Sequence, residues 1–175
     1  KLIEAGLDAV MLAHCCYPSL DESKKPACVS PTIIKEILRN ELGFDGIITT
    51  DNMMMGGILQ KYEMTEAIIQ AVSAGCDIIL CRDESPLRFK IIDSLINAVK
   101  SGRIEEDRID ESVKRILSMR WEMGLAENGG KVDASMADEP FNDPFVVQTA
   151  NEAARKTVML RDSASLLPVD PEEKI

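Results

Sequence analysis

Apolar and polar positions recur along the chain with two periods, one typical of strands and one typical of helices. A glycine and an aspartate precede a short apolar run three times, in the segments GLDAVMLAH, GFDGIITTD and GCDIILCRD. Runs that are apolar on successive positions predict strands buried on both faces, here residues 8–14, 46–50 and 78–81. Segments with helical periodicity separate them, so the pattern predicts repeated βα units around a parallel sheet.

Four helices are predicted between and after these strands. The first begins at Ser30 and Pro31, an N-cap followed by a proline in the first turn, and ends at Gly43. The next helix covers residues 64–74, with an apolar stripe formed by Ile68, Ile69, Ala71 and Val72. Two more helices are expected at residues 86–101 and 105–123, and the second of these is amphipathic.

The C-terminal part of the chain has a different pattern. Residues 126–144 are polar and contain glycine and proline, which predicts a linker. Residues 145–175 contain one predicted helix and a short strand, as at the beginning of a second domain. The chain has 175 residues, 45% of them hydrophobic, enough for one ordinary core and part of another. It opens within a helical pattern, so we interpret it as part of something longer.

Charge and cysteine content narrow the function classes. The net charge of −10, without a lysine- or arginine-rich block, argues against a nucleic-acid-binding surface. No apolar run approaches the roughly 20 residues of a membrane-spanning helix. The five cysteines are odd in number and form no CxxC pair, which disfavours a zinc site or a disulfide framework and suggests a reducing, cytoplasmic location. A small neutral or polar partner fits this composition best.

Polar side chains follow the predicted strands at their carboxyl ends: His14, Asp51, and Arg82 or Asp83. In parallel α/β folds the βα loops meet at this edge, so these side chains are expected to share a cleft. Each also has a simpler interpretation, namely a buried histidine, a helix N-cap and a surface ion pair. His14 is the only histidine in the sequence.

Three consecutive methionines, Met53, Met54 and Met55, come shortly after Asp51. Methionine adapts to irregular shapes, so an apolar shelf beside a lone carboxylate would suit the face of a sugar or another ring. Core packing is the simpler interpretation for at least two of the three. The residues alone therefore indicate a cleft with one well-placed carboxylate, without specifying a reaction.

Several segments resemble a known family of enzymes. ILRNELGFDGIITTDNM resembles the signature of glycoside hydrolase family 3. VMLAHCCYPSLD followed by PACVSPTIIKEILR is similar to the preceding segment in the bacterial β-N-acetylhexosaminidase branch. AGCDIILCRD and GRIEEDRIDESVKRILSMRWEMGL resemble the last barrel unit and the closing helix, and NEAARKTVMLRDSASLLPVD resembles the beginning of the family's α/β sandwich domain.

This resemblance implies a partial (β/α)₈ TIM barrel, with residues 1–125 supplying about the last three βα units and residues 145–175 beginning the second domain. It implies that Asp51, at the end of the seventh strand, is the catalytic nucleophile of a retaining mechanism with a covalent glycosyl-enzyme. His14 is implied to support the charged form of Asp51 or to bind substrate, and Met11 and Met55 to line the sugar site. No metal or organic cofactor is implied.

The resemblance has two departures. Many members of the branch have Asp-Asp-Leu-Ser-Met where this chain has DNMMM from Asp51 to Met55, so a second acid and a small hydroxyl are absent. The family's acid/base, a histidine and an aspartate on a loop after an earlier strand, would lie outside these residues. The implied partners are a small saccharide and either the rest of the barrel or a chain that covers its open edges.

The leading hypothesis is a retaining, exo-acting β-N-acetylglucosaminidase for cell-wall or chitin-derived saccharides. A β-glucosidase or β-xylosidase of the same family is the nearest alternative. The strand segment AHCCYP favours the hexosaminidase, because glucosidase-like members tend to have a tyrosine or an Asn-Gly pattern there. A non-catalytic fragment is the alternative from a different class, because three barrel strands would leave two open sheet edges.

Overall fold

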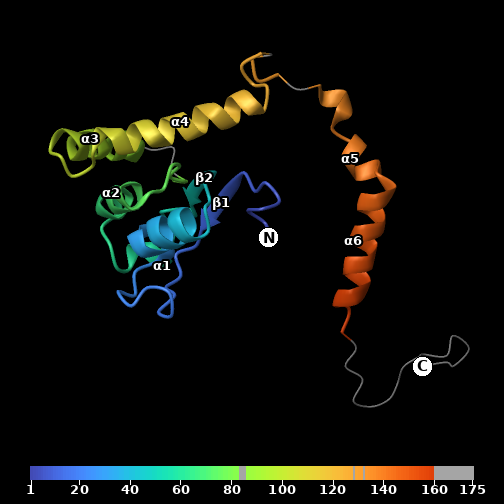
Figure 1. The fold of residues 1–175 in the computed structure, drawn as a ribbon, viewed down its shortest axis with the longest axis horizontal. Coiled ribbons are helices and arrows are strands. Elements are labelled where there is room, and N and C mark those ends of the chain that lie inside the picture. Colours follow the sequence, from blue (N-terminus) through green and yellow to red (C-terminus); the bar gives the residue numbers. More distant parts are fainter. Residues whose placement is uncertain (83–85, 128, 132, 160–175) are drawn as a thin grey trace, which may run out of the picture. The chain divides into compact units, whose positions relative to one another are not determined.

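The computed structural model describes residues 1–82, 86–127, 129–131 and 133–159 as an α/β protein rich in helix. The chain forms two compact units, Lys1–Gly130 and Lys131–Ile175. In the first unit, β1 (Ala9–Leu12) and β2 (Ile47–Thr50) pair in parallel, and Ala9 lies opposite Ile47 (Figure 1). The parallel pairing that the repeated strand pattern predicted is therefore present.

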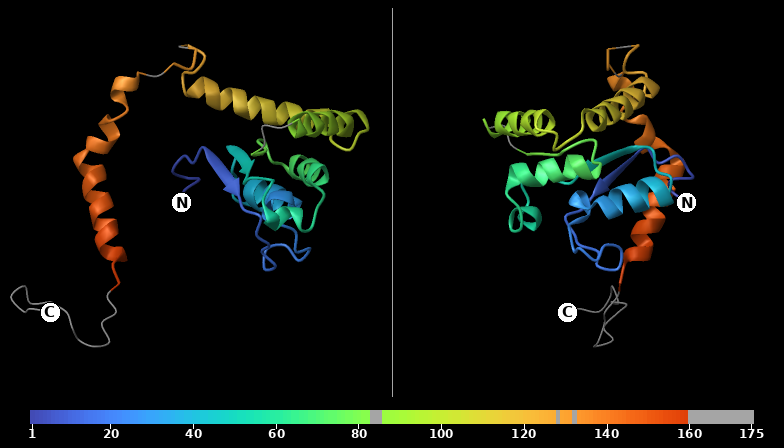
Figure 2. Two further views of the ribbon diagram at one scale, coloured as in Figure 1. Left: turned by 180° about the vertical axis from the view of Figure 1, so that it is seen from behind. Right: turned by 60° about the vertical axis from the view of Figure 1, so that its left-hand side comes forward.

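The first unit contains the four predicted helices in the expected order, together with two short helices that the pattern did not predict (Figures 1 and 2). They are η1 (Ala27–Val29), η2 (Thr32–Glu41), α1 (Gly56–Leu59), α2 (Met64–Ala74), α3 (Leu87–Lys100) and α4 (Glu106–Glu122). The second unit contains η3 (Ala134–Met136), α5 (Glu139–Asn142) and α6 (Pro144–Thr157). Two short helices thus lie in the segment predicted as a linker, and the strand expected after α6 falls mainly outside the described residues.

Local sequence signals explain the limits of the helices. At the start of η2, the Ser30 hydroxyl accepts a hydrogen bond from the N–H of Ile33 (3.1 Å), as expected of an N-cap. This helix is wound as a π-helix, and Leu42 N–H donates to the carbonyl of Ile37, five residues earlier (2.9 Å). The helix α2 has the bounds that its apolar stripe predicted, and the stripe is buried.

The prediction of a regular strand at residues 78–81 is wrong. Only Ile78 forms a parallel bridge, with Thr49. Beyond it the N–H of Leu80 donates to the side-chain hydroxyl of Thr50 (3.1 Å), and Leu80 O accepts from Met53 N–H (2.9 Å). The backbone hydrogen bonds to β2 stop here because the chain turns after β2. The side-chain hydroxyl of Thr50 then takes the place of the next backbone carbonyl as acceptor. Residues 78–80 still lie beside β2, on the side opposite β1.

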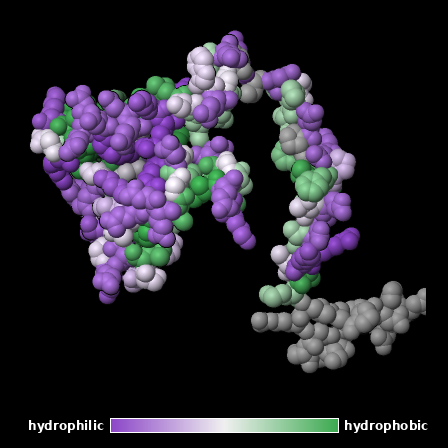
Figure 3. Space-filling model, in the orientation of Figure 1, coloured by the Kyte–Doolittle hydropathy of each residue, from purple (hydrophilic) through white to green (hydrophobic). Residues whose placement is uncertain are grey.

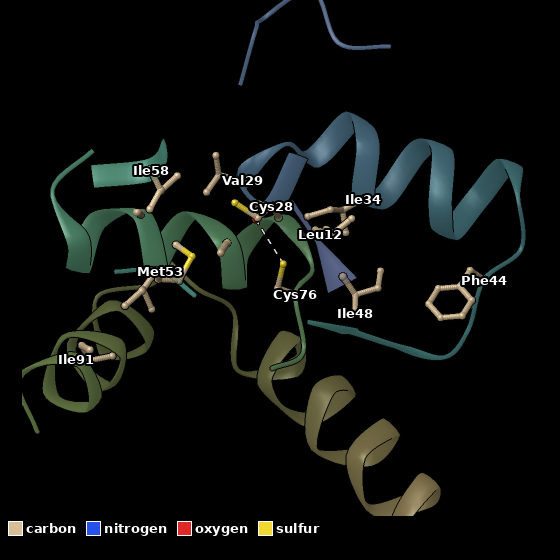
Figure 4. Close-up of a cluster of buried hydrophobic side chains, with 14 residues drawn as sticks. Leu12, Cys28, Val29, Ile34, Phe44, Ile48, Met53, Ile58, Cys76 and Ile91 are labelled. Carbon is tan, nitrogen blue, oxygen red and sulfur yellow. Dashed lines mark hydrogen bonds between the residues drawn. The ribbon is translucent and has the colours of Figure 1, made fainter. Parts of the chain in front are cut away.

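The main apolar cluster joins the strands to the helices around them, and a smaller one lies between α2 and α3. Figure 4 shows the buried side chains of the main cluster, contributed by both strands, by η1, η2, α1, α2 and α3, and by the segments between them. They include Leu12, Val29, Ile34, Phe44, Ile48, Met53, Ile58 and Ile91. Hydrophobic burial of this kind, about 25 cal/mol per Å² of apolar surface, holds the turn that follows β2 in place.

Large hydrophobic side chains also interrupt the polar surface of the first unit (Figure 3). On α3 and α4 the exposed ones are Phe89, Ile92, Ile96, Val113, Leu117 and Trp121. The helix α4 reaches the sheet mainly through polar side chains, so much of the apolar face that its pattern predicted remains exposed.

The polar contact between α4 and the sheet centres on Asp77, whose side chain has no exposed surface. Its Oδ2 accepts hydrogen bonds from Arg39 (2.8 Å) and from the N–H of Ile48 (2.9 Å). Its Oδ1 accepts from Arg108 (2.9 Å) and from the hydroxyl of Ser112 (2.7 Å). This carboxylate therefore connects η2, β2 and α4. It pairs with two largely buried guanidinium groups and, at 3.5 Å, with a third, that of Arg115.

Gly75, which ends α2, has a φ of +124°, and a Cβ there would lie 2.7 Å from Cγ2 of Ile34. We expect Gly75→Ala to lower the free energy of unfolding by about 3 kcal/mol, from backbone strain plus overpacking. Gly102→Ala is the matched control, because its φ is +72° and a Cβ there would meet no heavy atom within 4 Å. It should cost about 1 kcal/mol. Urea denaturation measures both, and equal losses would contradict the collision with Ile34.

Candidate functional site

Asp51 follows β2 directly, at the carboxyl end of the parallel pair. Its N–H donates to the carbonyl of Leu12 (3.0 Å), which ties it to the end of β1. Its Oδ1 accepts a hydrogen bond from the N–H of Asn52 (2.6 Å), and the residue is half-buried. The carboxylate is thus oriented by the backbone and partly open to solvent, at the edge where parallel sheets bind their ligands.

The side chain of Asn52 fixes the turn after the strand. Its Oδ1 accepts hydrogen bonds from the N–H of Met54 (3.1 Å) and from the N–H of Arg82 (3.2 Å). These hydrogen bonds connect the turn after β2 to the backbone at Arg82. Arg82 takes part through its backbone, whereas Asp83, the other candidate predicted there, lies outside the described residues.

His14 lies two residues after β1 and is half-buried. Its Nε2 lies 2.8 Å from the carbonyl oxygen of Asn52, and its Nδ1 lies 3.2 Å from Sγ of Cys28. The imidazole therefore contacts the backbone of the residue next to Asp51. The hydrogen bonds found among the described residues do not join this ring to the Asp51 carboxylate.

The buried Cys28 is a site neighbour that the sequence analysis missed. Burial, with a smaller contribution from the negative charge of Asp51, raises the pKa of its thiol to about 11. At neutral pH the thiol keeps its proton and can donate it in a hydrogen bond. The sequence analysis considered the cysteines only as metal ligands or disulfide partners, and the spacing of Cys28 from His14 gave no signal of their contact.

The methionines divide between core and surface. Met53 is fully buried in the apolar cluster, and Met54 is half-buried. Met55 and Met11 are exposed, at 46% and 59% of their surface, and are open to contact with other molecules. Met11 lies on β1 opposite Thr49, close to the strand end that leads to Asp51.

Metal clusters and membrane-spanning helices are not found in the described part of the chain. There, no three or more histidine, cysteine, aspartate and glutamate side chains are grouped to hold a metal ion. Within the same residues, no helix combines the length and apolar character needed to span a membrane. The thiols of Cys15, Cys16, Cys28, Cys76 and Cys81 form no disulfides.

Comparison with known proteins adds a family match. The family described as the glycosyl hydrolase family 3 N terminal domain matches residues 1–119. A protein of Cellulomonas fimi named β-N-acetylglucosaminidase/β-glucosidase is 27% identical over 180 aligned residues, which cover 97% of this chain and 31% of that protein.

Two solved structures are similar to this one. A family 3 β-N-acetylglucosaminidase from Paenibacillus sp. str. FPU-7 has 42% identity and a TM-score of 0.67, over 71% of this chain and 24% of that one. A β-glucoside phosphorylase, BglX, has 27% identity and a TM-score of 0.79, over 97% of this chain and 32% of that one. The chain therefore spans about a third or less of the length of these proteins.

Proposed function

Because the chain belongs to glycosyl hydrolase family 3, we propose that it supplies the nucleophile, Asp51, of a retaining, exo-acting β-N-acetylglucosaminidase. The observation that carries this proposal is the position of Asp51. It is a partly exposed carboxylate at the carboxyl end of β2, oriented by the N–H of Asn52. The proposal concerns the activity of the full protein, the role of this residue and the substrate.

In the proposed mechanism, a carboxylate oxygen of Asp51 attacks the anomeric carbon while a general acid protonates the departing glycosidic oxygen. The bond to the leaving group breaks and a glycosyl ester of Asp51 forms. Water, deprotonated by the same acid/base, then attacks the anomeric carbon from the other face and releases Asp51, with net retention. We place the acid/base, as the family resemblance implies, on a loop outside these residues.

The exposed methionines beside the sheet edge support a sugar site. Met55 and Met11 would offer apolar contact to a sugar face, a role the resemblance also implies. Preference for an N-acetylglucosaminide is supported by the 42% identity to the Paenibacillus β-N-acetylglucosaminidase. Saccharides derived from bacterial cell walls or chitin would provide such a substrate.

A glucoside substrate, with water or phosphate as acceptor, is the second candidate. It is supported by the likeness to the β-glucoside phosphorylase, which extends over 97% of the chain with a TM-score of 0.79. The Cellulomonas protein, whose name includes both activities, supports the same possibility of a glucoside substrate.

Rates on matched 4-nitrophenyl substrates separate the candidates, measured on the full-length gene product that contains this chain. We expect kcat/KM for the N-acetyl-β-glucosaminide to exceed that for the β-glucoside by at least about tenfold, because a site built for the acetamido group leaves polar groups unpaired without it. Equal or reversed rates would contradict this preference. A rate on the glucoside that rises with added phosphate would establish the second candidate.

A further inference from the structure

We propose that Cys28 and His14 are positioning residues for residues 51–54, called here the Asp51 turn. The Cys28 thiol holds the imidazole of His14 in the tautomer that carries its proton on Nε2. That N–H in turn binds the carbonyl of Asn52, the residue next to Asp51. The consequence for catalysis rests on the proposed function of Asp51, whereas the hydrogen-bonded arrangement does not.

The two contacts of the ring determine where its proton lies. A carbonyl oxygen only accepts hydrogen bonds, so at 2.8 Å from Asn52 O the Nε2 atom must be the donor. A neutral imidazole has one N–H, so Nδ1 is then an acceptor. The atom opposite it, 3.2 Å away, is the sulfur of Cys28, which can donate because its raised pKa keeps it protonated. The chain of bonds is complete only in this tautomer.

Cys28 is itself held in place from several sides. It has no exposed surface and lies in η1, among Leu12 and Val29 of the apolar cluster (Figure 4). Its carbonyl accepts a hydrogen bond from the thiol of Cys76 (3.4 Å), drawn as the dashed line in Figure 4. The preceding N–H, that of Ala27, donates to the carbonyl of Cys15 (2.9 Å). The sulfur therefore offers His14 a fixed partner.

The other side of His14 is confined by the segment after the Asp51 turn. A Cβ on Gly57 would lie 3.3 Å from Cβ of His14, so the backbone there approaches the histidine closely. Without the thiol, the proton could move to Nδ1, and Nε2 would then face Asn52 O as a second acceptor. The loss of that hydrogen bond would release the Asp51 turn and misplace the carboxylate, which reduces the rate of attack.

Three variants of the full-length gene product test the catalytic part of the proposal. Because a displacement of about 1 Å can cost about a hundredfold in rate, we expect Cys28→Ala to lower kcat about tenfold with KM changed less than about twofold. Cys28→Ser keeps a hydroxyl donor and should recover kcat to within about threefold of the parent. Val29→Ala truncates a buried residue of the same turn whose side chain has no hydrogen-bonding group, so its kcat should stay within about twofold of the parent.

The tautomer is read separately, from the ¹⁵N and ¹H signals of the His14 ring by NMR, assigned with a His14→Gln variant. We expect the proton on Nε2 in the parent and in Cys28→Ser, and a changed ring signal in Cys28→Ala. A proton on Nδ1 in the parent would overturn the proposal, as would a Cys28→Ala enzyme with the kcat of Val29→Ala. An Asp51→Ala enzyme with normal turnover would instead overturn the proposed function, while the NMR result would still decide the arrangement of the ring.

Discussion

Replacement of Asp51 by alanine is expected to lower kcat on an N-acetyl-β-glucosaminide by at least about 10⁴-fold, because the covalent step loses its attacking group. Added azide should partly restore turnover, since the small anion can enter the space left by the carboxylate and attack the anomeric carbon directly. The glycosyl azide formed should have the α configuration, opposite to that of the substrate. Steady-state rates and NMR of the product measure both effects.

Asp45→Asn is the matched control, because this exposed carboxylate lies at the other end of the same strand segment, where it forms an ion pair with Arg115. Its turnover should match that of the parent protein. An Asp51→Ala enzyme that keeps most of its turnover, or that yields a β-azide, would show that another group is the nucleophile.

Replacement of Asp77 by asparagine is expected to have the largest effect on stability, a loss of about 3–5 kcal/mol in the free energy of unfolding. The change removes a negative charge that has no exposed surface and leaves the guanidinium groups of Arg39 and Arg108 without it. Both arginine side chains are themselves largely buried, at 14% and 11% exposure, so water compensates them poorly. Chemical denaturation of the variant and its parent measures the loss.

The same carboxylate makes stability depend on pH. Burial raises the pKa of Asp77, but hydrogen bonds from Ile48 N–H, Arg108 and Ser112, together with the charge of Arg39, outweigh it and lower the pKa below 3.8. A carboxyl group with a lowered folded-state pKa stabilises the fold above its unfolded pKa and loses that contribution as the pH falls through the folded value. Stability should therefore decline below about pH 4, and less steeply in Asp77→Asn.

The exposed carboxylate of Asp45 again provides the control; its partner Arg115 also reaches Asp77, at 3.5 Å from Oδ1, and keeps that contact in the control variant. The side chain of Asp45 is 93% exposed, so Asp45→Asn should change the free energy of unfolding by less than about 1 kcal/mol. Two results would show that the buried carboxylate does not stabilise the fold in this way. One is a similar loss of unfolding free energy in the two variants, and the other is a decline in stability below about pH 4 that is unchanged by Asp77→Asn.

The sequence predicted those features that depend on neighbours along the chain. The apolar stripe and the glycine at position 75 determine α2, and Ser30 caps η2 as its position indicated. Asp51 lies at the end of a strand because a β-branched run leads up to it. The parallel pairing of two strands also followed from the repeated order of glycine, aspartate and apolar run.

The features that depend on distant contacts were not predictable in the same way. Asp8, Asp45 and Asp77 occupy equivalent places in the repeated pattern, yet of these three only Asp77 is the centre of a buried ion network, because its arginines come from 38 and 31 residues away. The third predicted strand does not form because the hydroxyl of Thr50, and not a backbone carbonyl, accepts the hydrogen bond from Leu80 N–H. Strand propensity does not predict such a contact. The contact between His14 and Cys28 likewise depends on how the loop after β1 folds back.

The role of Asp51 can be tested most directly by trapping the covalent intermediate. The full-length gene product would be incubated with a fluorinated N-acetylglucosaminide that forms a slowly hydrolysed glycosyl-enzyme, and then analysed by intact mass and peptide mapping. We predict one added sugar per protein chain, located on Asp51. An adduct on a different carboxylate, or steady turnover of substrate without any adduct on the peptide that contains Asp51, would contradict the account.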